Sequence, residues 1–124
     1  MLAVRHTIFK LKQQRREIAF QSAVRSYADV MKPGMSRKEV EDYLTAKNIG
    51  FRRMCCVDRT QFSKGVYDDV TQIGEEEAPW FCSYKNVYVA FQFTGPKHPV
   101  LSTTADPTDT LKAVSLYRRL EDCW

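Results

Sequence analysis

The sequence predicts an α+β fold in which an N-terminal helical hairpin packs on one face of a small antiparallel sheet of three to four strands. Apolar residues recur at helical spacing before Gly50 and alternate with polar residues after it. A Pro33–Gly34 pair divides the helical part in two. With 124 residues, 44% of them apolar and 27% charged, the chain is sufficient for one domain with its own core.

The first helix is expected from about Ile8 to Met31, because proline at position 33 cannot continue it. Its early part is basic and poor in apolar residues. We therefore expect residues 1–19 to be an exposed helical extension and residues 20–124 to form a single domain. If a membrane anchor precedes the chain, this extension would lie next to the membrane. The expected apolar face consists of Phe20, Val24, Tyr27 and Met31.

A capping box predicts the start of the second helix. The Ser36 hydroxyl is placed to accept a hydrogen bond from the backbone N–H of Glu39, whose carboxylate can reach back to the Ser36 N–H. The helix is expected to end near Lys47–Asn48, before Gly50. Its inward side chains are expected to be Val40, Tyr43 and Leu44.

The remainder of the chain is typical of strands joined by turns. The clearest strand is 87–93, in which the apolar odd-numbered side chains share one face and Tyr88 and Ala90 lie on the other. Lys85–Asn86 is expected to be the hairpin turn before it. Further strands are expected at 51–57, 66–73 and 80–84, with a charged turn over 74–79 and a long loop over 95–109.

The last segment, Leu111–Leu120, fits two patterns. As a helix it groups Leu111, Val114 and Tyr117, and as a strand it groups Val114, Leu116 and Leu120. We predict a strand, because an isolated strand at 87–93 needs partners and a stable sheet needs three or more strands.

Charge is distributed unevenly. The net charge is +4, but residues 1–62 hold 13 basic against 6 acidic side chains, and residues 63–124 hold 6 against 9. The basic side chains cluster in the first helix at Lys10, Lys12, Arg15 and Arg16. A solvated helix face explains them, and an anionic membrane surface or an acidic protein is the alternative. Nucleic acid is not expected as a partner, since no nucleic-acid-binding module is present.

The four cysteines are Cys55, Cys56, Cys82 and Cys123. Without Cys-x-x-Cys spacing and with two histidines, a zinc site is not expected. Adjacent cysteines in a strand point to opposite faces, so Cys55 and Cys56 are not expected to bridge each other. We expect at least one disulfide, Cys82–Cys123, because a cysteine near the terminus can hold a segment that would otherwise fray. The alternative is four reduced thiols.

Sequence motifs for catalysis are absent. No phosphate-binding glycine loop, His-Glu-x-x-His or Gly-x-Ser-x-Gly occurs, and no cofactor is expected. A thiol enzyme would use Cys82 or Cys56 as nucleophile, His98 as base and Asp106 to orient it, but the spacing does not support this arrangement. The acidic residues Asp68, Asp69 and Glu75–Glu77 are expected in solvated loops. We predict that the protein is not an enzyme.

An aromatic segment, Trp80-Phe81-Cys82-Ser83-Tyr84, supplies the interface candidates Trp80, Phe81 and Tyr84. Strand alternation buries only one face of it, and large exposed aromatic side chains favour protein interfaces. The alternative is that Trp80 closes the core beneath the long loop.

The residues Gly34 to Leu44, Gly-Met-Ser-Arg-Lys-Glu-Val-Glu-Asp-Tyr-Leu, resemble the signature of the small envelope lipoproteins of outer-membrane assembly (the SmpA/OmlA family). The β-lactamase inhibitor proteins are similar in pairing two helices with a small antiparallel sheet. The resemblance implies an exported protein that binds other proteins without catalysis.

These observations lead to a functional hypothesis: a non-catalytic protein-binding module of the bacterial cell envelope. The alternative is an inhibitor or immunity-like protein that blocks a partner enzyme, and a small cytosolic enzyme or nucleic-acid binder is the third. No secretory signal is visible near Met1, so export or membrane anchoring would depend on a segment absent from this chain. We expect the periplasm or cell envelope, with the cytoplasm as the alternative.

Overall fold

The fold is α+β, as the sequence predicts. The computed structural model describes residues 2–58, 65–95 and 105–124, with side chains from Thr7 onward. Four strands form one antiparallel sheet in the order β1-β2-β3-β4. The elements are α1 (Leu2–Val30), α2 (Arg37–Ala46), β1 (Arg52–Met54), β2 (Asp68–Glu76), β3 (Cys82–Thr94) and β4 (Thr110–Cys123).

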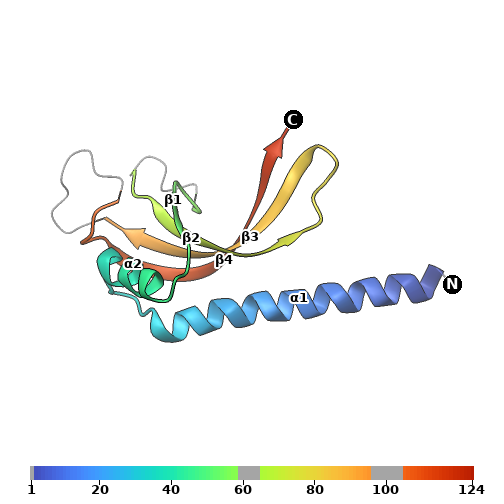
Figure 1. Ribbon diagram of the computed structural model, residues 1–124, viewed down its shortest axis with the longest axis horizontal. Helices are drawn as coiled ribbons and strands as arrows, with labels where there is room; N and C mark the ends of the chain where they lie inside the picture. Colours follow the sequence, from blue (N-terminus) through green and yellow to red (C-terminus); the bar gives the residue numbers. More distant parts are fainter. Residues whose placement is uncertain (1, 59–64, 96–104) are drawn as a thin grey trace.

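α1 ends, and α2 begins and ends, close to the predicted positions, but α1 begins at Leu2, before the predicted start at Ile8. Gly34 has a φ of 97°, a value that glycine adopts without strain, and so it turns the chain between α1 and α2. Both halves of the capping box at Ser36 and Glu39 are formed. Figure 1 shows α1 as one long helix running beneath the curled sheet, whose strand ends near the C-terminus bend away from it.

The ambiguous last segment is a strand, which confirms the prediction for Leu111–Leu120. It pairs with β3 over nearly its whole length, with Val89 opposite Leu116 and Phe91 opposite Val114. The helical spacing of its apolar residues is overridden because these ladder hydrogen bonds complete the sheet.

The predicted turns around β3 are wrong. Lys85 and Asn86 do not form a hairpin turn but pair with Leu120 and Arg119 of β4 within one continuous strand. The chain reverses earlier, between the end of β2 at Glu76 and Cys82, so the predicted turn at 74–79 is partly strand. Lys85 is tolerated in mid-strand because it is partly exposed, and the buried Asn86 amide is tolerated because it is hydrogen-bonded to Gln72 and Glu121.

Alternation along β3 separates two apolar clusters, as predicted. Val89, Phe91 and Phe93 pack with Met31, which follows α1, and with Val40 and Leu44 of α2. Tyr27 of α1 meets the Phe91 ring edge-on at 5.5 Å. Tyr88 and Ala90 lie in a second cluster on the other face with Met54 and Val70. The predicted strand 51–57 is shorter, ending at Met54.

The acidic pair Asp68 and Asp69 is buried, which corrects the prediction of a solvated loop. Arg37, at the start of α2, is fully buried and donates to Asp109 at 2.8 Å and to Asp69 at 2.9 Å. Its guanidinium also lies 4.1 Å from the Phe93 ring centroid. A buried cation requires such partners, so the two aspartates join α2 to β2 and to the start of β4.

Candidate functional site

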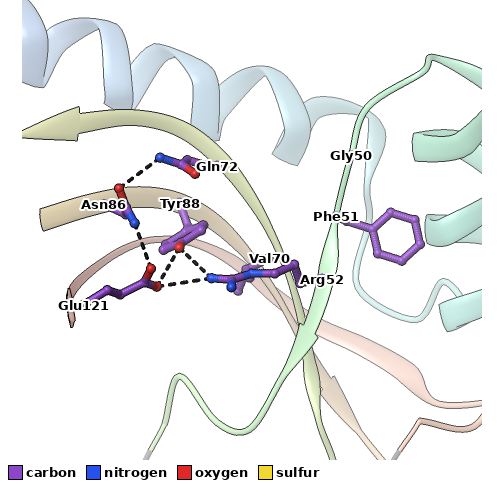
Figure 2. A pocket seen from close by; sticks show the side chains of 8 residues that line it. All are labelled: Gly50, Phe51, Arg52, Val70, Gln72, Asn86, Tyr88 and Glu121. Carbon is purple, nitrogen blue, oxygen red and sulfur yellow. Dashed lines mark hydrogen bonds and ion pairs between the residues drawn. The ribbon is translucent and has the colours of Figure 1, made fainter. Parts of the chain in front are cut away.

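A pocket of about 360 Å³ opens on the sheet face that carries Tyr88, opposite the face that carries Phe91. Figure 2 shows the polar side chains grouped over the strands, while Phe51 points away toward the helices. The lining residues are Gly50, Phe51, Arg52, Val70, Gln72, Asn86, Tyr88 and Glu121. All four strands thus contribute to one site.

Hydrogen bonds join the polar residues of the pocket into a network. Arg52 Nη2 donates to the Tyr88 hydroxyl at 2.6 Å and to Glu121 Oε1 at 3.1 Å. The Tyr88 hydroxyl donates to Glu121 Oε1 at 2.7 Å. Asn86 Nδ2 donates to Glu121 Oε2 at 2.8 Å, and Gln72 Nε2 donates to Asn86 Oδ1 at 3.0 Å. Each side chain is therefore held in a defined orientation.

The network keeps Glu121 ionised and Tyr88 neutral. Burial raises the pKa of Glu121, but the hydrogen bonds from Tyr88, Asn86 and Arg52 outweigh it, and the pKa lies below its ordinary value. Burial and the nearby Glu121 carboxylate raise the pKa of Tyr88. The pocket therefore presents a carboxylate that is held by three neighbouring side chains.

The second part of the site is an aromatic tip, defined here as Trp80, Phe81 and Trp124. Trp80 meets the Phe81 ring at 5.8 Å and the Trp124 ring at 6.2 Å, both edge-on. Trp80 is 84% exposed and Trp124 is 93% exposed. The alternative that Trp80 closes the core is wrong, because Trp80 lies in the turn before β3 begins.

A disulfide fixes the aromatic tip to the sheet. Cys82 and Cys123 are bonded, as predicted, at paired positions of β3 and β4. Beyond the bond, the Trp124 N–H donates to the Phe81 carbonyl at 2.8 Å. The chain end is therefore attached beside the turn that carries Trp80, and the two indoles share one surface.

The second disulfide corrects a prediction. Cys55 and Cys56 are bonded to each other across a cis peptide bond. Strand alternation does not separate them, because β1 ends at Met54. The proposed thiol nucleophiles Cys56 and Cys82 are thus both in disulfides, and the proposed base His98 lies outside the described residues.

The pocket and the aromatic tip are neighbours on the sheet. A second pocket shares Arg52 and Glu121 with the first and extends along β4 to Cys123, the residue before Trp124. Tyr84, exposed on β3 opposite Glu121, lies on the same face. The predicted interface candidates Trp80, Phe81 and Tyr84 are therefore all exposed, and the structure adds Trp124.

Sequence reasoning missed most of the pocket. Alternation along 87–93 places Tyr88 on the face opposite the core, which is the one signal that could have found it. Arg52 and Glu121 are 69 positions apart, and no local pattern predicts that they meet. The place of Trp124 beside the aromatic segment could have been predicted, because Trp124 follows Cys123 of the predicted disulfide.

The basic cluster lies elsewhere, on the N-terminal half of α1. Lys10, Lys12, Arg15 and Arg16 are all exposed. Arg16 borders a groove of about 550 Å³ between α1 and the turn that follows β2. In the described part of the chain, no helix is long and apolar enough to cross a membrane, and no cluster of three or more candidate ligands is suited to a metal ion.

Comparison of the chain with protein-family models, with curated proteins and with solved structures finds no match.

Proposed function

We propose that this protein is a non-catalytic protein-binding module whose binding surface runs from the pocket to the aromatic tip. The observation that supports this most directly is the pair of tryptophans, Trp80 and Trp124, 84% and 93% exposed beside a disulfide. Exposed indoles are costly in water and are concentrated in the centres of protein interfaces. Tyr84, Arg52 and Arg119 add the other residue types common there.

Rigidity of this surface favours binding. The Cys82–Cys123 bond holds the aromatic tip, and the network around Glu121 holds the pocket side chains. A surface that is ordered before association loses less conformational entropy when a partner arrives.

The proposal also assigns a role to the helices, which lie on the other face of the sheet. We take α1 and α2 as one hairpin that supports a single face of the sheet, so that the face with Tyr88 is left for a partner. Phe20 of α1 lies against Gly74 of β2, and Val40 and Leu44 of α2 are buried in the main core. Residues 20–124 then act as the binding domain, and residues 1–19 as its extension.

The compartment proposed is the periplasm or cell envelope of a bacterium. Two disulfides support it, since such bonds persist in oxidising compartments and are rare in the cytosol. The resemblance of residues 34–44 to envelope lipoproteins agrees with this proposal.

Site-specific cross-linking tests the proposal. A photo-reactive side chain is placed at position 80 of the full chain, or at exposed Lys47 directly after α2 as the control. The protein is then incubated with envelope extract of its host. A discrete adduct is expected at position 80 only. An excess of unlabelled wild-type protein should reduce the yield of this adduct, whereas an excess of the Tyr84→Ala/Trp124→Ala variant should not. Equal labelling from both positions would contradict the proposal.

An inhibitor is the second candidate, because a protruding aromatic tip can fill the cleft of a partner enzyme. The two candidates differ in one measurement. If the cross-linked partner is an enzyme and loses activity at one-to-one stoichiometry, the protein is an inhibitor, whereas an unchanged activity favours the binding module.

A further inference from the structure

A third surface, on the outward side of α1, is not used by the proposed protein-binding site. Ile8, Leu11 and Ile18 are 49%, 47% and 68% exposed. Their spacing of i, i+3 and i+10 places them on one side of the helix. Phe20 and Tyr27, which contact Gly74 and Phe91 of the sheet, lie on the roughly opposite side. Figure 1 shows no other element below α1 on this outer side.

The charge around this aliphatic stripe has one sign. Lys10, Lys12, Arg15 and Arg16 are exposed in the same half of α1. The first acidic residue of the helix is Glu17, and its carboxylate is bonded to Arg118 of β4. Arg15 falls between Leu11 and Ile18 on the same side of the helix, so a cation lies within the stripe.

We propose that the outward side of α1 binds the surface of an anionic lipid bilayer. The aliphatic stripe would enter the headgroup region, and Lys12 and Arg15 would reach the lipid phosphates while their alkyl chains cover apolar surface. The sheet and the aromatic tip would then face away from the lipid and stay open to a protein partner. This inference uses other residues than the proposed binding site, so either one can fail alone.

The side chains of the stripe favour lipid over two protein occupants. A second copy of the chain would bring Arg15 and its basic neighbours against the same cations, which repel each other. A partner helix in a coiled coil requires a longer apolar repeat than Ile8, Leu11 and Ile18 provide. An anionic bilayer needs only moderate apolar area together with several cations.

Vesicle co-sedimentation of the full chain tests the inference. Phosphatidylcholine vesicles are compared with vesicles that also contain phosphatidylglycerol. Lys12→Gln/Arg15→Gln removes two charges from the stripe, and Lys32→Gln/Lys47→Gln removes two exposed charges elsewhere as the matched control. Leu11→Ser/Ile18→Ser removes apolar side chains, with exposed Val30→Ser as its control. Circular dichroism verifies that each variant is folded.

Salt-sensitive binding to the phosphatidylglycerol vesicles alone is expected. Lys12→Gln/Arg15→Gln should lower the partition coefficient about 30-fold, since each cation near an anionic surface contributes a factor of about five. Leu11→Ser/Ile18→Ser should lower it too, while both controls stay near wild type. The inference would be overturned by an absence of binding or by equal binding to both vesicle types. It would also be overturned if the control variants had partition coefficients as low as those of the stripe variants.

Two further readouts identify other occupants. The only tryptophans, Trp80 and Trp124, are in the aromatic tip, so their emission should not shift to shorter wavelength when α1 binds lipid. A shift would indicate that the tip enters the bilayer and would overturn the inference. Concentration-dependent self-association that Leu11→Ser/Ile18→Ser abolishes would indicate a second copy and would also overturn it.

Discussion

Arg37 Nη1 lies 2.9 Å from Asp69 Oδ1, and neither side chain is exposed. The second Asp69 oxygen is buried and has no hydrogen-bond partner within the described part of the chain. The carboxylate of Glu41 is nearby, itself bonded to Arg53 at 2.8 Å. Two carboxylates cannot bond without a proton between them. A proton on Asp69 supplies the missing donor and lowers the negative charge of the cluster.

Asp69 should therefore make stability depend on pH. Burial, together with the nearby Glu41 carboxylate, raises the pKa of Asp69 from 3.8 to about 8. The folded state then holds a proton that the unfolded state releases. The stabilising effect of this proton is complete below 3.8 and is lost as the pH rises through about 8. Between these values the free energy of unfolding should fall as the pH rises, because the unfolded state releases a proton that the folded state keeps.

Asp69→Asn isolates this contribution, because its amide can donate to Glu41 and accept from Arg37 without titrating. Urea unfolding across this pH range should give a flatter profile for the variant than for wild type. Carboxyl groups that do not interact with Asp69 titrate equally in both proteins and cancel in the difference. Parallel profiles would show that Asp69 is ionised in the folded state.

Arg37 should be the most sensitive charged position of α2. Arg37→Met keeps the length of the side chain but leaves Asp69 and Asp109 buried without their cation. The expected loss is about 3–5 kcal/mol in the free energy of unfolding. Lys38, the next residue, provides the control: its ion pair with Asp42 is exposed, so Lys38→Met should leave stability close to wild type. Similar losses for both variants would contradict a structural role for the buried cation.

Local sequence signals predicted the elements that depend on local chemistry. The capping box at Ser36 and the Pro33–Gly34 turn involve neighbours in sequence, and both are formed. Alternation over 87–93 and the Cys82–Cys123 bond were also predicted, since strand periodicity and a terminal cysteine are visible in one segment.

The errors concern residues whose environment is set by distant parts of the chain. Asp69 is of a residue type that is usually found in exposed loops. It can be buried here only because Arg37, 32 positions away in the sequence, pairs with it. Lys85–Asn86 has the sequence of a turn but is held in β3 by β4. The pocket network likewise depends on Arg52 and Glu121 meeting across the sheet.

Gly74 should be needed for the contact between α1 and β2. A Cβ added there would lie 2.6 Å from Phe20 Cε1. Gly74→Ala is therefore expected to lower the free energy of unfolding by about 1–3 kcal/mol, because the buried ring must shift. Leucine lacks the Cε1 and Cζ atoms, so in a Phe20→Leu background the same change should cost less. Thermal unfolding of the four proteins of this cycle measures the coupling, and strictly additive effects would show that Gly74 and Phe20 do not constrain each other.

The Cys82–Cys123 bond should matter for both stability and binding. It closes a separation of 41 positions, so Cys82→Ala/Cys123→Ala is expected to lose about 2–4 kcal/mol under non-reducing conditions. The pairing of β3 with β4 extends far beyond the bond, and the domain should still fold. In the folded variant Trp124 is no longer held beside position 80, so cross-linking from a photo-reactive side chain at position 80 should fall. A variant that loses stability but cross-links normally would show that the tip is ordered by its ring contacts alone, and that the disulfide has no part in recognition.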